Sequence, residues 1–252
     1  MRAVRAAWRL LRAVVHGLHG LAIVLLRFPS LDRAARRERV RWWAAGLLRS
    51  LGVQVQVDGH FRPGATMLVA NHVSWIDIMV VHAVCPQARF VSKAEARRWP
   101  VLRRLVDAGD TLYIERERKR DAMRVVHQCA DALRAGDTVA VFPEGTTGPG
   151  DALLPFHANL LQAAIAVAAP VQPLALRYSD RRHAVSPAAL WIGDTTLAGT
   201  FWLLAAADGL QVHLSVLPAR ATAHADRRAL AETVRMDIVG ALADIDRRHR
   251  PA

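Results

Sequence analysis

Two kinds of hydrophobic periodicity divide the chain near residue 52. In residues 40–51 the apolar positions recur every three or four residues, as they do on one face of an amphipathic helix. These positions are Val40, Trp43, Ala44, Leu47, Leu48 and Leu51. After Gly52 the period changes to two, because Val53, Val55 and Val57 alternate with polar residues, and this alternation predicts a β-strand. We therefore expect a helical segment, residues 1–51, followed by a separate domain, residues 52–252.

Short apolar runs bounded by polar or turn residues predict six further strands in this domain. They lie at 66–70, 89–92, 111–115, 138–142, 171–177 and 211–217. Helical patterns lie near 75–84, 94–108, 120–135, 157–168 and 226–246. Strands that alternate with helices predict an α/β fold, in which helices cover a mixed sheet. In the less regular part, LWIGD (190–194) is compatible with a strand, and 196–207 with either a buried helix or a surface that contacts lipid.

The longest apolar run, residues 13–26, is short for a membrane-spanning helix. A helix of this length would measure about 21 Å, whereas the hydrocarbon core of a bilayer is about 30 Å thick. Arginines lie on both sides of the run, so the charge asymmetry that orients a spanning helix is lacking. A helix that lies in one leaflet fits better. A cleaved secretory signal is disfavoured, because Phe28-Pro29-Ser30 does not begin with the small residue that a cleavage site requires.

The positive charge is concentrated in the same N-terminal segment. Of the formal net charge of +12, residues 1–50 carry +9, since they contain eleven arginines and two acidic residues. This distribution argues against a uniformly basic nucleic-acid-binding protein, and no nucleic-acid-binding motif is present. We expect the segment to bind an anionic membrane surface, with Arg36, Arg37, Trp42 and Trp43 in the headgroup layer. The alternative is a helical pair that packs on its own domain and exposes its arginines to water.

The two cysteines, Cys85 and Cys129, lie in apolar surroundings without CxxC spacing. They predict buried thiols in a reducing compartment, and they indicate neither a disulfide framework nor a structural zinc site. The sequence contains no P-loop, GxGxxG, GxSxG or HExxH motif. Nucleoside triphosphate-binding, dinucleotide-binding, serine-hydrolase-elbow and zincin classes are therefore disfavoured.

The first candidate for chemistry is NHVSWID (71–77), directly after a predicted strand, where open α/β sheets often place catalytic groups. His72 and Asp77 would not face each other within one helix, because five residues correspond to about 140° around its axis. They can meet if His72 precedes a helix that is capped by Ser74. Such an Asp–His pair would orient the imidazole as a general base toward an alcohol. The alternative is a Ser74/Asp77 capping box with an incidental His72.

Two further strand ends carry candidate binding groups. The stretch FPEGTTGPG (142–150) combines three glycines with two hydroxyls, a composition typical of turns that expose backbone N–H groups to an anion. Arg116 follows the strand predicted at 111–115, and its forked donors suit a phosphate monoester. Taken alone, Glu144 is also compatible with a solvated loop carboxylate, and Arg116 with a solvated turn.

Together, four ordered blocks resemble the glycerophospholipid acyltransferase family, the bacterial 1-acylglycerol-3-phosphate O-acyltransferases. They are NHVSWID (71–77), TLYIER (111–116), FPEGTT (142–147) and APVQPLAL (169–176). The resemblance implies transfer of a fatty acyl group from acyl-CoA or acyl-ACP (acyl-carrier protein) to the sn-2 hydroxyl of 1-acylglycerol-3-phosphate. It implies no metal and no cofactor besides the acyl donor, and a peripheral or monotopic location on the cytoplasmic face of the inner membrane.

The resemblance also implies roles for single residues. His72 would remove the hydroxyl proton, and Asp77 would orient the imidazole and stabilise its charged form. Arg116 would hold the phosphate of the acceptor, while Glu144 and Gly145 would position its glycerol end. The other substrate contacts expected are Asn71, Lys93 and Thr146. Acylation of another lyso-lipid, such as lyso-ornithine lipid, is the alternative within this class, and a non-catalytic peripheral membrane-binding protein is the alternative outside it.

Overall fold

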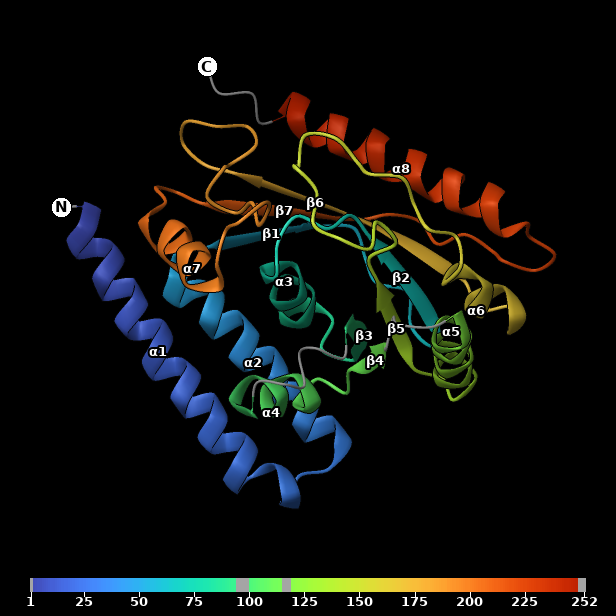
Figure 1. The fold of residues 1–252 in the computed structure, drawn as a ribbon, viewed down its shortest axis with the longest axis horizontal. Coiled ribbons are helices and arrows are strands. Elements are labelled where there is room, and N and C mark those ends of the chain that lie inside the picture. Colours follow the sequence, from blue (N-terminus) through green and yellow to red (C-terminus); the bar gives the residue numbers. More distant parts are fainter. Residues whose placement is uncertain (1, 94–99, 115–118, 249–252) are drawn as a thin grey trace.

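The computed structural model describes residues 2–93, 100–114 and 119–248, and it contains one seven-stranded sheet in the order β1-β7-β6-β2-β5-β3-β4 (Figure 1). The strands are β1 (Gln54–Asp58), β2 (Thr66–Ala70), β3 (Ala88–Lys93), β4 (Leu112–Ile114), β5 (Thr138–Val141), β6 (Val171–Ser179) and β7 (Gln211–Val216). The seven strands expected from the sequence are all present. The stretch LWIGD is not a strand, so that expectation was wrong.

The sheet is mixed, as predicted. Strands β6, β2, β5, β3 and β4 run parallel to one another, whereas β7 pairs antiparallel with β6 and parallel with β1. Val69 of β2 is in register with Val141 of β5, so these two strands end side by side. The segments that follow them, 71–77 and 142–150, therefore begin at the same edge of the sheet, where open α/β sheets bind their ligands.

Helices cover both faces of the sheet. They are α1 (Arg2–Leu26), α2 (Arg33–Leu51), α3 (Ile76–Val84), α4 (Pro100–Ala108), α5 (Lys119–Arg134), α6 (Leu161–Ala166), α7 (Leu197–Ala206) and α8 (Arg227–Arg248), with a short 3-10 helix at Phe28–Ser30. Along β6 the side chains alternate: Leu174, Leu176 and Tyr178 join one core cluster with α1, α2, α3 and α7, while Ala175 joins a second cluster with α5, α6 and α8. Figure 1 shows α8 on the opposite side of the sheet from α3.

Helix α2 uses its apolar face to cover the protein's own core. It begins at Arg33, and the preceding Asp32 is its N-cap, since the Asp32 side chain accepts a hydrogen bond from the Ala35 N–H at 2.7 Å. Leu47, Leu48 and Leu51 at its other end are buried in the cluster of α3 and α7. The alternative of a helical pair packed on its own domain thus describes α2, and a membrane role for its arginines stays a prediction.

Helix α1 begins eleven residues before the apolar run from which it was expected. Arginine side chains interrupt the apolar pattern there, but they have partners in the fold: the Arg2 guanidinium donates to the Ala206 carbonyl at 3.2 Å, and Arg9 donates to the Ala205 and Ala207 carbonyls at 3.0 and 2.8 Å. The full helix has 25 residues, about 38 Å, so the argument that it is too short to span a bilayer does not apply to it.

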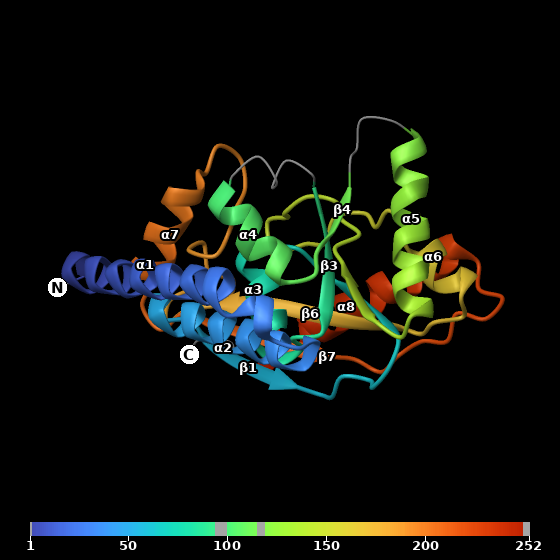
Figure 2. The same cartoon turned by 90° about the horizontal axis from the view of Figure 1, so that it is seen from below.

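Among the described residues, α1 is the one helix with the length and composition of a membrane span, and it is mostly exposed. Signal sequences near an N-terminus meet the same criteria, so this finding alone does not assign a span. Its exposed side carries an apolar stripe of Val4, Trp8, Leu11, Val15, Leu18 and Leu25. In both views α7 lies beside α1 (Figures 1 and 2), and Trp202 and Leu203 of α7 are also exposed.

Candidate active site

His72, which follows the end of β2, is in contact with Asp77, which lies at the start of α3. His72 precedes the helix and Asp77 is its second residue, so the carboxylate reaches back to the imidazole and places Asp77 Oδ2 at 2.8 Å from His72 Nδ1. The Asp77 side chain is fully buried, whereas that of His72 is 18% exposed. A carboxylate acceptor assigns the proton to Nδ1. Nε2 is then the unprotonated nitrogen that can take a proton from a substrate, which is the geometry of a general base.

Asp77 is held in place by donors from three directions. Its Oδ2 also accepts hydrogen bonds from the Val73 and Ser74 N–H groups, at 2.7 and 2.9 Å. Its Oδ1 accepts a hydrogen bond from the Tyr178 hydroxyl at 2.6 Å. The bond to Ser74 N–H is one half of a capping box, but the Ser74 hydroxyl has no partner in the described part of the chain. Asp77 therefore stabilises the start of α3 and contacts His72 at the same time.

Glu144 supports His72 from the loop after β5. It is buried, its Oε1 accepts a hydrogen bond from the His72 N–H at 2.7 Å, and its Oε2 accepts one from the Leu154 N–H at 3.0 Å. Burial raises the pKa of Glu144, while the two backbone hydrogen bonds act in the opposite direction. Because both carboxylate oxygens bind backbone donors of the protein, Glu144 joins three segments behind the imidazole. Its expected contact with an acceptor stays a prediction.

The glycine-rich loop 142–150 wraps closely around His72. The Gly148 N–H donates to the His72 carbonyl at 2.7 Å, and a Cβ at Gly148 would lie 3.0 Å from Glu144 Oε2. Gly145 has a φ of 72°, which glycine adopts without strain. The Phe142 ring stacks on the imidazole with 4.0 Å between centroids. These contacts give Gly148 a structural reason, since a side chain at this position would crowd the Glu144 carboxylate.

A third segment, which the sequence did not indicate, also braces the site. The Trp191 N–H donates to the Val73 carbonyl at 3.2 Å, and the Thr147 hydroxyl donates to the Trp191 carbonyl. Trp75 Nε1 donates to the Thr200 hydroxyl of α7 at 3.0 Å. Trp191, in the segment before α7, thus contacts both sequence blocks of the site, and Thr200 of α7 contacts the first block.

The remaining predicted substrate contacts are placed in different ways. The Asn71 side chain is buried and exchanges two hydrogen bonds with the Leu176 backbone, at 2.9 and 2.8 Å, so that it ties β2 to β6. Thr146 is exposed on the loop, and Lys93 is the last residue of β3. Arg116 lies outside the described residues. Their roles toward a substrate stay predictions.

The residues expected in the membrane headgroup layer are at the junction of α1 and α2. The rings of Trp42 and Trp43 pack against His16 of α1, with centroids 4.9 and 6.2 Å apart. The Arg36 side chain donates to the Phe28 carbonyl at 3.0 Å, and the Arg37 guanidinium lies 3.7 Å from Asp137. These contacts stabilise the N-terminal pair of helices, and a contact with lipid headgroups stays a prediction.

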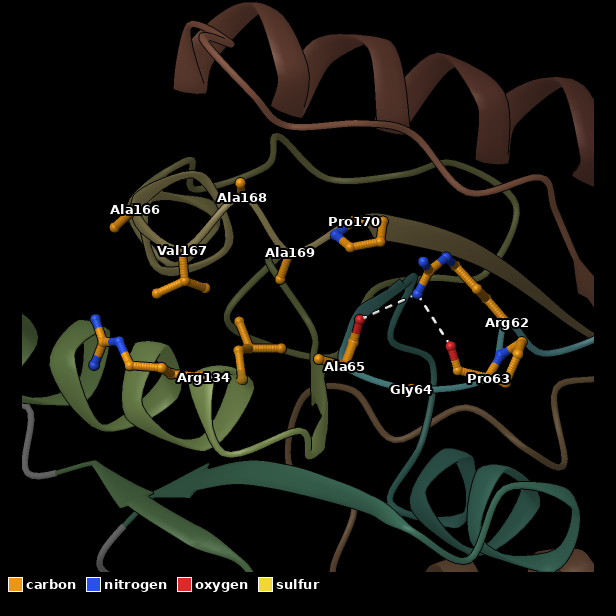
Figure 3. Close-up of a pocket in the computed structure, with 11 residues that line it drawn as sticks. Arg62, Pro63, Gly64, Ala65, Arg134, Ala166, Val167, Ala168, Ala169 and Pro170 are labelled. Carbon is orange, nitrogen blue, oxygen red and sulfur yellow. Dashed lines mark hydrogen bonds between the residues drawn. The ribbon is translucent and has the colours of Figure 1, made fainter.

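Other parts of the molecule offer less for catalysis. A pocket of about 590 Å³ lies near the starts of β2 and β6, between Arg62 and Arg134 (Figure 3), and His72 is not among its lining residues. No group of three or more His, Cys, Asp or Glu residues that could hold a metal ion occurs in the described ranges. Cys85 and Cys129 are free and buried, as predicted, and burial raises the pKa of each thiol to about 12.

Comparisons with known proteins find similar acyltransferases. A family model described as Acyltransferase matches residues 52–177. The lyso-ornithine lipid O-acyltransferase of Pseudomonas aeruginosa is 36% identical over 251 residues, which cover 96% of each chain. The 1-acyl-sn-glycerol-3-phosphate acyltransferase of Neisseria meningitidis is 33% identical over 204 residues, which cover 79% of this chain and 78% of the relative.

The fold is also shared with a solved structure. The crystal structure of the 1-acyl-sn-glycerophosphate (LPA) acyltransferase, PlsC, from Thermotoga maritima matches with a TM-score of 0.73. The match covers 97% of this chain and 98% of that one at 21% sequence identity. At this level of identity the likeness shows a common architecture.

Proposed function

This chain belongs to the lipid acyltransferase family, and we propose that it moves a fatty acyl group from an acyl thioester to the hydroxyl of a lyso-lipid with His72 as the general base. The observation that carries the proposal is the 2.8 Å contact between His72 Nδ1 and Asp77 Oδ2, which leaves Nε2 as the nitrogen for the substrate. The donor is acyl-CoA or acyl-ACP, as the resemblance implies.

The reaction proceeds in one displacement. Nε2 of His72 takes the proton of the acceptor hydroxyl while its oxygen attacks the thioester carbonyl carbon. Asp77 stabilises the imidazolium that forms. The carbon–sulfur bond then breaks, the thiolate takes the proton from His72, and the new ester leaves with the acyl group. No acyl-enzyme is required, because the thioester is already activated and the bound hydroxyl is held beside it.

Glu144 acts in this scheme as a positioning residue for the base. Its two oxygens hold the backbone of His72 and of Leu154, and Gly148 holds the His72 carbonyl. The imidazole is fixed further by its stack on Phe142. Gly145 and exposed Thr146, on the same loop, are the groups that we propose for contact with the acceptor.

We propose lyso-ornithine lipid as the preferred acceptor. Two observations support this choice: the Pseudomonas relative aligns over 96% of the chain, and the segments around His72, 71–77 and 142–150, contain no lysine or arginine. A phosphomonoester usually requires such cations, whereas lyso-ornithine lipid carries no phosphate. The second candidate is 1-acylglycerol-3-phosphate, which the Neisseria relative and the position of Arg116 after β4 favour.

The acceptor is tested with the purified full chain. Lyso-ornithine lipid and 1-acylglycerol-3-phosphate are each supplied with acyl-CoA and with acyl-ACP, and the acylated lipid is measured. We expect kcat/KM to be higher for lyso-ornithine lipid, and Arg116→Gln to change it little with this acceptor. Faster turnover of 1-acylglycerol-3-phosphate that Arg116→Gln abolishes would reverse the assignment. Absence of acyl transfer to either acceptor would favour the non-catalytic membrane-binding protein.

We also propose that the exposed stripe of α1 binds the membrane, at the cytoplasmic face of the inner membrane where the acyl donors are made available. Exposed Trp202 and Leu203 of α7, beside α1, extend this apolar surface. Exposed apolar side chains flanked by arginines are typical of helices that bind anionic lipid surfaces.

The membrane contact is tested with point variants, because removal of residues 1–51 would also remove the core residues of α2. Leu11→Glu and Leu18→Glu place charges on the stripe, at side chains that are 54% and 62% exposed. Met236→Glu, on α8 at a residue that is 52% exposed, is the control. We expect the two α1 variants to sediment less with phosphatidylglycerol vesicles than the control. Equal sedimentation would contradict an α1 contact.

A further inference from the structure

Tyr178 touches the proposed catalytic pair from the side opposite to the imidazole. Strand β6 lies next to β2, and its alternation turns Leu174, Leu176 and Tyr178 toward α3. Tyr178 is 2% exposed, and its hydroxyl donates to Asp77 Oδ1 at 2.6 Å. Since Asp77 Oδ2 lies 2.8 Å from His72 Nδ1, the phenol, the carboxylate and the imidazole form one hydrogen-bonded series.

The phenol of Tyr178 is a permanent donor in this series. Burial raises its pKa well above the ordinary value, and the neighbouring Asp77 raises it further. The hydroxyl therefore remains protonated over the working range of an enzyme and gives its hydrogen to the carboxylate. Hydrogen bonds from neutral donors to an ionised acceptor are short and strong, which the distance of 2.6 Å matches.

Asp77 has other hydrogen-bond donors, so the effect of the Tyr178 hydroxyl on the charge of the carboxylate can be distinguished from an effect on its orientation. The Val73 and Ser74 N–H groups fix the Asp77 carboxylate from its own loop, so its orientation does not depend on the phenol alone. Within the described ranges, Glu144 is a further titratable side chain bonded to the His72 segment, and it accepts from the His72 N–H. Arg177, the next residue along β6, turns to the other side of the sheet and pairs with Asp246 at 2.9 Å.

We propose that Tyr178 is a positioning residue that sets how strongly Asp77 holds the protonated imidazole of His72. The proposal rests on the role of His72 as the general base. A donor on Oδ1 takes up part of the negative charge of the carboxylate, so that less of it acts on the imidazolium. Without this donor, Asp77 stabilises the imidazolium of His72 more strongly. His72 then stays protonated to a higher pH, and in that form it cannot act as a base.

Tyr178→Phe tests this directly, because it removes the hydroxyl and keeps the ring. The pH dependence of kcat/KM is measured from about pH 5 to 9 with the full chain, acyl-CoA and a lyso-lipid acceptor. We expect the acid limb of the profile to move upward by about half a pH unit to one unit, so that kcat/KM at a fixed pH on this limb falls about three- to tenfold. At the high-pH plateau the variant should approach the wild-type rate.

Thr222→Val is the matched control for lost stability. Thr222 is buried on the other side of the sheet, and its hydroxyl donates to the Ala169 carbonyl at 2.9 Å. This variant also loses one buried hydrogen bond, so its Tm should fall, but its pH profile should keep the wild-type position. A Tyr178→Phe profile with an unmoved acid limb would overturn the proposal, whatever the change in Tm.

A second measurement predicts a shift of opposite sign without removing any contact of Tyr178. The chain has two tyrosines, so 3-fluorotyrosine incorporated into a Tyr113→Phe background labels Tyr178 alone. Fluorine makes the phenol a stronger donor, and the acid limb should move to lower pH than in the unlabelled Tyr113→Phe protein. An upward shift or none contradicts the proposal. Failure of His72 as the base is distinguished separately, since His72→Ala would then retain turnover.

Discussion

Replacing Glu144 should lower both the stability and the activity of the protein. Glu144→Ala removes both acceptors at once and leaves the N–H groups of His72 and Leu154 without their bonds of 2.7 and 3.0 Å. An unsatisfied buried N–H costs about 1 to 3 kcal/mol, so two cost about 2 to 6 kcal/mol. Removing a buried charge whose pKa is raised returns part of this, and water entering the space left returns more. We therefore expect a net loss of about 2 to 3 kcal/mol in the free energy of unfolding.

The same variant should lose activity by a larger factor than its stability explains. Among the described residues, the bond from Gly148 is the one that the His72 backbone would keep. A base displaced by about 1 Å can lose about 100-fold in rate. The assays are urea unfolding followed by circular dichroism and acyl-transfer kinetics at a temperature where the variant is folded. We expect kcat to fall about 10- to 100-fold and KM for the acceptor to change less than threefold.

Glu144→Gln separates this account from a direct contact with the acceptor. Glutamine keeps one acceptor for the His72 N–H but has no second acceptor for Leu154, so it should retain more of the kcat than alanine does. If Glu144→Ala instead raised the acceptor KM strongly and left kcat and the unfolding free energy unchanged, Glu144 would bind substrate, and its assignment as a support of His72 would be refuted.

Three further predictions concern the rest of the fold. Asp137→Asn should lower the free energy of unfolding, measured by urea unfolding, by about 2 to 4 kcal/mol. The buried carboxylate of Asp137 faces Arg33, Arg37 and Arg89, whose charges would repel each other without it. An unchanged transition midpoint would contradict this. Arg9→Gln should lower the free energy of unfolding by about 1 kcal/mol in the same assay, because it removes a cationic donor from the carbonyls at the C-terminal end of α7. Arg39→Gln, at an exposed arginine, is the control, and an equal loss in the two variants would refute a capping role for Arg9. Burial raises the pKa of both cysteine thiols to about 12, so they should react with a thiol reagent at neutral pH only after the protein unfolds. Mass spectrometry measures the labelling, and fast labelling of the folded protein would contradict their burial.

The strands were predictable because a strand buried on both faces of a sheet is a short, nearly continuous apolar run. TMLVA (66–70) is such a run, and its ends coincide with those of β2. The start of α1 was not predictable in the same way. Arg2 and Arg9 look like solvated charges until the fold brings the carbonyls of α7 to them, from about two hundred residues further along the chain.

The site was partly predictable for a related reason. His72 and Asp77 are close in sequence, so a loop followed by a helix start brings them together. Tyr178 is 101 residues from Asp77, and only the pairing of β6 with β2 places its hydroxyl on the carboxylate. The alternation of Leu174, Leu176 and Tyr178 was a usable signal for the face of the strand, but the strand order was not visible in the sequence.

Glu144 shows why residue type alone does not give a role. A carboxylate in a glycine-rich loop is compatible with a substrate contact, a helix cap or a solvated charge. In the structure its two oxygens accept from the backbone N–H groups of His72, 72 residues before it, and Leu154, 10 residues after it. Such a bridge depends on tertiary structure, so no local pattern indicates it.

The central claim is that His72 is the base of an acyl transfer to a lyso-lipid. The most direct measurement compares wild type and His72→Ala, both bound to vesicles, for release of the free thiol of the acyl donor and formation of the acylated lipid. The account predicts equal amounts of the two products for wild type, and a loss of about 1000-fold or more for His72→Ala with an unchanged circular dichroism spectrum and Tm. Turnover by a folded His72→Ala protein within about tenfold of wild type would contradict the claim.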